Sequence, residues 1–64
     1  MYLVLRTSRG EEEYQGKFTN ISIDSIDVAE KEVYFNCAYE DGEEVLIRSK
    51  VGMACIVNDN YLEV

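Results

Sequence analysis

Between Val33 and Ile47 the apolar side chains recur at every second position, on both sides of an acidic turn around Gly42. Successive side chains of a strand point to opposite faces, so this alternation is typical of half-buried strands. Two such runs separated by a short turn predict a β-hairpin. This hairpin is the clearest local signal in the chain.

The apolar pattern also indicates the length of the turn. A two-residue loop at Asp41–Gly42 would place Phe35 opposite Arg48 and mix the core face with the solvent face. A three-residue loop, in which Gly42 takes the left-handed conformation, brings apolar residues opposite one another. We therefore predict these pairs: Tyr39 with Glu43, Cys37 with Val45, Phe35 with Ile47, and Tyr34 with Arg48.

Further strands are expected toward both ends of the chain. Met1–Leu5 is a continuous apolar run, typical of a short strand buried on both faces. Met53–Val57 is a second apolar run, and turn residues separate it from a closing strand at Tyr61–Val64. The polar stretch Thr7–Glu13, interrupted by Gly10, is predicted to be a loop.

The stretch from Tyr14 to Val28 changes its apolar phase twice. Apolar positions are even at Tyr14 and Phe18, odd at Ile21 and Ile23, and even again at Ile26 and Val28. A strand keeps its buried face through such changes by bending or bulging. The spacing of Phe18, Ile21, Ser25 and Val28 also fits a helix, which is the competing interpretation. The β-branched content favours a strand, with a turn at Ala29–Glu32.

Short strands with tight turns predict a small antiparallel barrel or two packed sheets. We expect a single all-β domain spanning 1–64, a five-stranded antiparallel SH3-like barrel, because closure removes open edges. At 64 residues the burial is marginal, so a second copy could add stability and a homodimer is left open. The expected core is Leu3, Leu5, Phe18, Ile21, Ile23, Ile26, Phe35, Cys37, Val45, Ile47, Ile56 and Leu62.

Two segments resemble known families. The tail Asn60–Val64 resembles the last turn and strand of SH3 domains; it implies only the barrel, because the family's Ala-Leu-Tyr-Asp-Tyr opening and tryptophan are missing. Met1–Arg6, Ile21–Ile23 and Val45–Arg48 resemble strands of the carbon-storage-regulator RNA-binding proteins. That resemblance implies a small dimeric regulator, of this or the Sm-like kind, that binds RNA through Arg6, Arg9 and Arg48.

The two cysteines, Cys37 and Cys55, lie among apolar neighbours, and the chain has no histidine. Two cysteines are too few for a secreted disulfide scaffold or a structural zinc site, so we expect buried free thiols. No segment is long enough for a signal-peptide core or a membrane span. We expect a cytoplasmic protein without metal, cofactor or membrane contact.

Charge is distributed unevenly along the chain. Eleven of thirteen acidic residues lie between Gly10 and Glu44 with only two lysines, so this stretch carries −9 while the whole chain carries −7. Such a field attracts basic partners and repels nucleic acid. The candidate partner-binding residues form three groups. The first is Glu11, Glu12 and Glu13, the second is Glu40, Asp41, Glu43 and Glu44, and the third is Asp24, Asp27, Glu30 and Glu32. The second group lacks the ligand spacing of a calcium loop.

No catalytic motif accompanies these charges. Without histidine, Ser–His and Cys–His arrangements cannot form, and the glycines are too scattered for a phosphate loop. We expect a non-enzymatic, acidic protein-binding domain that is encoded by a phage or mobile element. It would inhibit a host defence protein by mimicking nucleic acid on that protein's basic nucleic-acid-binding surface. In size and charge it is similar to small acidic phage inhibitors of host defence nucleases. The alternatives are the RNA-binding regulator described above and a structural subunit of a larger assembly.

Overall fold

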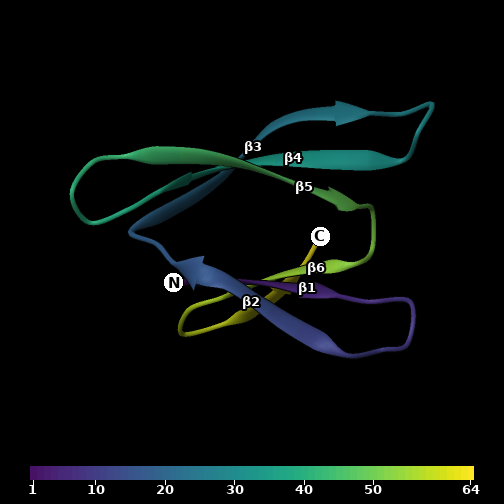
Figure 1. Cartoon of the computed structure of the whole chain (residues 1–64), viewed down its shortest axis with the longest axis horizontal. Helices are drawn as coiled ribbons and strands as arrows, with labels where there is room; N and C mark the ends of the chain where they lie inside the picture. Colours follow the sequence, from purple (N-terminus) through teal and green to yellow (C-terminus); the bar gives the residue numbers. More distant parts are fainter.

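The computed structural model describes all 64 residues, which form strands and turns. The strands are β1 (Tyr2–Arg6), β2 (Glu12–Lys17), β3 (Asn20–Asp27), β4 (Glu32–Ala38), β5 (Glu44–Lys50), β6 (Ala54–Val57) and β7 (Tyr61–Glu63). They make a four-stranded sheet in the order β2-β1-β6-β7 and a three-stranded sheet in the order β3-β4-β5, both antiparallel (Figure 1). The all-β prediction is confirmed.

The closed five-stranded barrel is wrong. The stretch after Gly10 becomes strand β2, because Glu12 and Glu13 pair with Arg6 and Leu5 of β1 instead of forming a loop. The tail adds to the outer side of β6 as a separate strand. The outermost strands β2, β7, β3 and β5 each pair on one side only, so the sheets stack as two layers without closing.

The β4–β5 hairpin has the predicted register. Phe35 pairs with Ile47, Cys37 with Val45, and Tyr34 with Arg48. The N–H of Tyr39 donates to the Glu43 carbonyl (2.8 Å), and Gly42 adopts a φ of 90°. The three-residue loop is therefore confirmed.

Strand β3 takes up residues 20–27 of the stretch 18–28, so the helical interpretation is wrong. The first phase change falls where the chain passes from β2 in one sheet to β3 in the other. The second is a bulge: Ile23 pairs with Phe35 and Ser25 with Tyr34, which leaves Asp24 as the extra residue. The turn follows at residues 28–31, where Lys31 has a positive φ of 55°.

The core lies between the two sheets. Its buried members are Leu3, Phe18, Ile21, Val33, Phe35, Cys37 and Ala54, against which Met1, Leu5, Val45, Ile47, Ile56 and Val64 pack partly buried. Three predicted core residues are exposed instead: Ile23 by 49%, Ile26 by 56% and Leu62 by 59%. Each pairs with a core residue and so shares its face, but lies on an outermost strand beyond the cover of the opposite sheet.

Candidate functional site

The first acidic group lies on and just before strand β2. Glu11, Glu12 and Glu13 are all exposed, and none forms an ion pair or a side-chain hydrogen bond. The nearby Arg6 pairs with Glu63 instead (3.7 Å). No partner therefore offsets the charge of these three carboxylates, which lie on and just before an outermost strand.

The second acidic group surrounds the β4–β5 turn. Asp41 Oδ1 accepts a hydrogen bond from the backbone N–H of Glu43 (3.0 Å), which holds the turn. Glu44 Oε2 accepts one from the side-chain amide of Asn36 (3.2 Å). The side chains of Glu40 and Glu43 are exposed and make no such contact. This end of the three-stranded sheet is therefore acidic throughout.

The third acidic group divides into structural and free carboxylates. Asp27 Oδ1 accepts a hydrogen bond from the backbone N–H of Glu30 (3.1 Å) and holds the β3–β4 turn. Glu32 has a side chain only 14% exposed and pairs with Arg48 (3.4 Å) and Lys50 (3.7 Å). Glu32 is thus largely neutralised, whereas Asp24 and Glu30 remain exposed.

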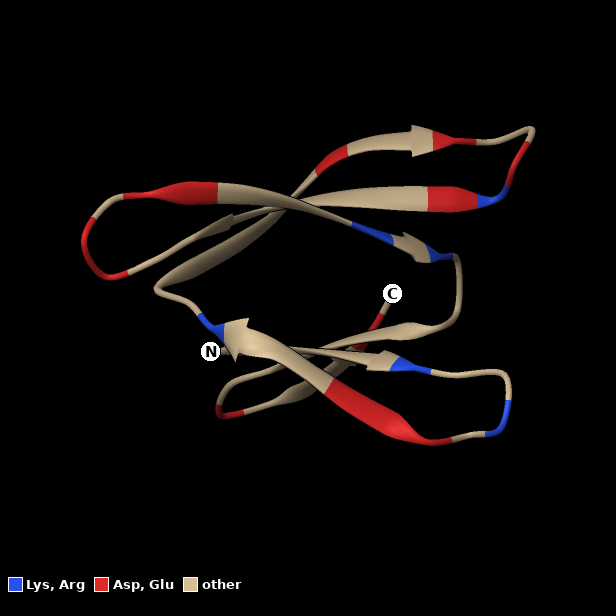
Figure 2. Cartoon of the chain, in the orientation of Figure 1, with Lys and Arg blue, Asp and Glu red and all other residues tan.

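The structure does not gather the three groups into one patch. The second group and most of the third lie at opposite ends of β4, whose seven residues span about 20 Å. Asp24 lies beside the middle of β4, and the first group lies on the other sheet. Figure 2 shows them as red segments at the left tip, the upper right and the lower right of the molecule. The negative charge is spread over the ends of an elongated domain.

The arginines of the alternative RNA-binding interpretation do not form one surface. Arg6 directly follows Leu5, and Arg48 directly follows Ile47, and both of these apolar residues pack against the core. Because side chains alternate along a strand, the two arginines lie on the outer faces of different sheets. Each is also engaged in an ion pair, Arg6 with Glu63 and Arg48 with Glu32. Only Arg9, in the β1–β2 turn, is free of one.

A group of tyrosines that was not predicted as a site lies on the outer face of the four-stranded sheet. Tyr2, Tyr14 and Tyr61 are 39%, 69% and 57% exposed, and the rings of Tyr2 and Tyr14 meet edge to face with centroids 5.7 Å apart. They surround the buried Val4 and Cys55. The sequence signal for this face is the alternation along β1. Leu3 and Leu5 point to the core, so Tyr2, Val4 and Arg6 point to a second, partly apolar face.

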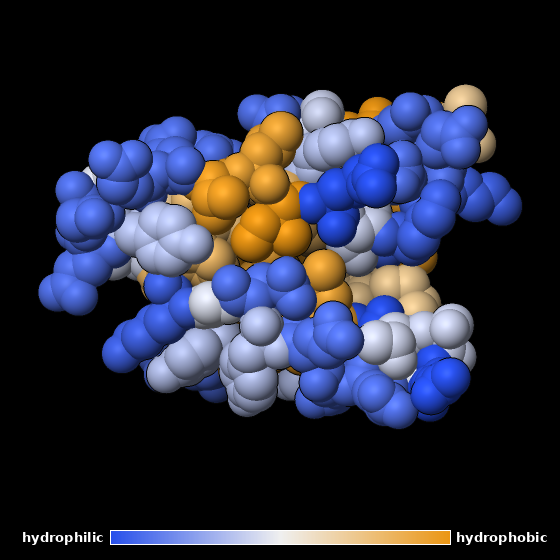
Figure 3. All heavy atoms as spheres, in the orientation of Figure 1, coloured by the Kyte–Doolittle hydropathy of each residue, from blue (hydrophilic) through white to orange (hydrophobic).

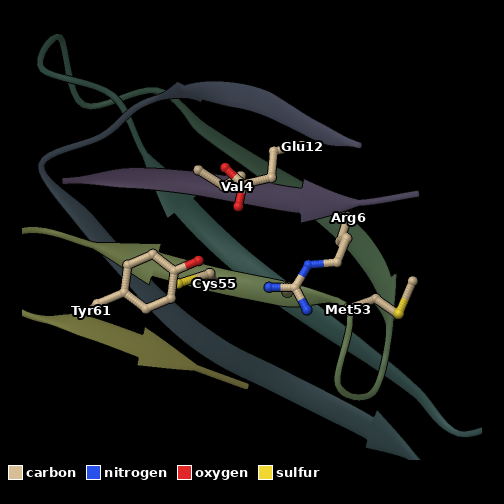
Figure 4. Close-up of a pocket in the computed structure, with 7 residues that line it drawn as sticks. Val4, Arg6, Glu12, Met53, Cys55 and Tyr61 are labelled. Atoms are coloured by element: carbon tan, nitrogen blue, oxygen red, sulfur yellow. The ribbon is translucent and has the colours of Figure 1, made fainter. Parts of the chain in front are cut away.

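A small hollow lies on this outer face. Figure 4 shows the Tyr61 hydroxyl next to the Cys55 thiol, with the Arg6 guanidinium beside them. The thiol raises the pKa of Tyr61 above its ordinary value, desolvation and the Glu12 carboxylate act in the same direction, and Arg6 opposes them. The hollow holds about 10 Å³ of free space, enough for one water and far below the roughly 300–1,000 Å³ of small-molecule sites.

Both cysteines are buried and free, as the sequence predicts. Cys37 lies on the core face of β4, and burial raises the pKa of its thiol. Cys55 lies beside Val4, on the outer face of the four-stranded sheet. The backbone of that sheet separates the two thiols, so the fold keeps them from forming a disulfide.

Compared with known proteins, the chain matches no family model, no curated protein and no solved structure. No helix of the length and apolarity that a membrane crossing requires is present. No three histidine, cysteine or acidic side chains are grouped so that they could hold a metal ion.

Proposed function

We propose that this domain is a non-enzymatic, acidic protein-binding module that occupies a basic surface of a nucleic-acid-binding protein in place of nucleic acid. One observation carries the proposal: most carboxylates are free. Only Asp27, Glu32, Asp41, Glu44 and Glu63 engage in ion pairs or side-chain hydrogen bonds; the others face water with their charge uncompensated. The corresponding role is inhibition of a host protein in the cytoplasm, as for phage inhibitors of similar size and charge.

The charge density supports mimicry of a single strand more than of a duplex. Seven net charges over a long axis of 33 Å correspond to one charge about every 5 Å. A single nucleic-acid strand carries one per about 3.4 Å of helix axis and a duplex one per about 1.7 Å. Free acidic groups at both ends would let the domain span a groove that normally holds a short stretch of phosphate backbone.

Two other functions are less well supported. RNA binding by Arg6, Arg9 and Arg48 would need these residues on one surface, but Arg6 and Arg48 lie on different sheets and in ion pairs. A structural subunit role has no specific observation in its favour. A gel shift against random RNA at low salt distinguishes the first alternative, because tight binding would contradict mimicry.

The proposal is tested by capture from a host lysate at low and high salt. The immobilised domain should retain a basic nucleic-acid-binding protein at low salt and release it at high salt. The reason is that salt screens the charge interactions that supply the affinity. A matched control is the domain with Glu11, Glu12 and Glu13 reversed to Lys. Salt-resistant capture of a protein without affinity for nucleic acid would contradict the proposal.

A further inference from the structure

Strand β3 is an open edge of the three-stranded sheet. It pairs only with β4, so alternate residues along its other side present unpaired backbone N–H and C=O groups. Figure 1 shows its second half running along the upper edge of the molecule, away from the four-stranded sheet. Such an edge can accept a further strand through main-chain hydrogen bonds.

The core-side face of this edge is apolar and uncovered. Ile23 and Ile26 pair with the buried Phe35 and Val33 and so share their face, yet they are 49% and 56% exposed. Figure 3 shows apolar side chains gathered in the middle of the molecule, between hydrophilic ends. A strand added beside β3 would extend the sheet and place its own apolar side chains next to these isoleucines.

Charge determines which strand can occupy the edge. Asp24 is the exposed extra residue of the bulge, Asp27 lies on the face opposite the isoleucines, and Glu30 follows in the turn. A second copy pairing through β3 would bring these carboxylates against their counterparts, and like charges facing each other are destabilising. A segment that carries lysine or arginine would instead find an opposite charge at each of these places.

We propose that β3 binds an extended segment of the basic partner, in which apolar side chains alternate with basic ones. The apolar side chains pack beside Ile23 and Ile26, and the basic ones lie on the opposite face near Asp27. The inference rests on the proposed function for the positive charge of the partner. The new point is that the partner binds in part by adding a strand to the open edge of β3.

The test uses a synthetic heptapeptide of alternating lysine and isoleucine, with blocked ends, and the isotope-labelled domain. Amide hydrogen exchange should slow along Asn20–Asp27 when the peptide is added, and the resonances of these residues should shift. The control peptide has the same composition with its isoleucines contiguous. Equal protection by the control peptide, or protection confined to β2 or the β4–β5 turn, would overturn the proposal.

A matched pair of variants tests the apolar contact. Ile26→Ser should weaken peptide binding about five- to tenfold, the factor expected from losing roughly half of an isoleucine's burial. Leu46→Ser is the control, because Leu46 is 55% exposed but lies on the outer face of β5, opposite Asn36. Equal effects of the two substitutions would contradict binding at β3.

Sedimentation across a concentration series separates the occupants. The domain alone should remain a monomer, and a dimer abolished by Ile26→Ser would assign the edge to a second copy instead. A separate experiment, in which the domain competes with a single-stranded oligonucleotide for the captured partner, tests the proposed function without the peptide. If the domain displaces the oligonucleotide but the peptide does not bind to β3, strand addition is wrong and the proposed function stands. If the peptide binds to β3 but the oligonucleotide is not displaced, strand addition stands and mimicry of nucleic acid is wrong.

Discussion

The ring of Phe18 lies directly over the backbone of Gly16. A Cβ added to Gly16 would come within 3.0 Å of the Phe18 ring, and Phe18 itself is only 2% exposed. Gly16 follows the extra residue Gln15, at the place where the β1–β2 pairing shifts register. The glycine lets the core aromatic cover the end of β2, just before the chain crosses to the second sheet.

Gly16→Ala should therefore destabilise the domain by roughly 2–4 kcal/mol, because both a positive φ and a steric clash oppose it. Gly42→Ala is the matched control: its φ is also positive, at 90°, but no atom lies within 4 Å of the added Cβ. That variant should cost about 1 kcal/mol. Urea denaturation measures both, and equal losses would show that Phe18 moves freely.

Phe35→Ala should cost about 3–5 kcal/mol, since Phe35 is completely buried at the centre of the core. Most of the stability of so small a domain would then be lost. Thermal and urea unfolding followed by circular dichroism measure the change. A variant that melts like the parent would mean that the sheets do not pack across Phe35.

Val33 and Ile26 test where the core ends. They pair across β3 and β4 on one face, but Val33 is 1% exposed and Ile26 56%. Val33→Ala should cost about 2 kcal/mol and Ile26→Ala less than about 1 kcal/mol, although isoleucine is the larger residue. The opposite order in urea denaturation would indicate that β3 is covered in solution.

These residues also show what the sequence could predict. Alternation assigns Ile23, Ile26 and Leu62 correctly to the inner face of their sheets, since it follows the pleat of the strand. It contains no information on whether another layer extends over that face. The β4–β5 hairpin was predictable because its apolar pairs and Gly42 are both local. Closure of a barrel depends on contacts between distant strands, and that prediction failed.

The candidate site was predictable in sign but not in detail. Composition indicates an acidic domain, yet it cannot separate Glu32, held in two ion pairs, from the free Glu30 two residues earlier. In the sequence Glu63 is simply an acid outside the acidic segment. In the structure it pairs with Arg6 across the sheet. Such pairings depend on which strands become neighbours, and no local pattern contains that.

Alkaline pH should destabilise the domain through Cys37. Burial raises the pKa of this thiol above its ordinary value of 9.0, so the folded state holds the proton that the unfolded state loses. The contribution of Cys37 to the free energy of unfolding is complete at pH values below the ordinary pKa. It is lost as the pH rises through the raised pKa of the folded state. Urea denaturation at several pH values measures the slope, and Cys37→Val should flatten it. An unchanged slope in this variant would assign the effect to other groups, such as Tyr61.

Charge reversal should identify the carboxylates that bind. Changing Glu11, Glu12 and Glu13 to Lys should weaken binding to the captured partner and make its salt dependence shallower, because fewer ion pairs remain to be screened. Asp24→Lys with Glu30→Lys should act in the same way, since both carboxylates are exposed and neither holds the turn. The control is Asp59→Lys in the β6–β7 turn, since Glu63 is engaged with Arg6. Binding titrations at two salt concentrations provide the comparison.

Equal weakening by every reversal, per charge changed, would mean that net charge alone drives binding. No effect of any reversal would move the contact to the tyrosine face. Tyr2, Tyr14 and Tyr61 are then the residues to replace.

Competition with nucleic acid is the decisive experiment for the proposed mimicry. A labelled single-stranded oligonucleotide is bound to the captured partner, and its fluorescence anisotropy is followed while the domain is added. Mimicry of nucleic acid predicts stoichiometric displacement at low salt, weaker displacement at high salt, and none by the variant with Glu11, Glu12 and Glu13 reversed to Lys. A ternary complex, in which the domain binds the partner while the oligonucleotide stays bound, would contradict it.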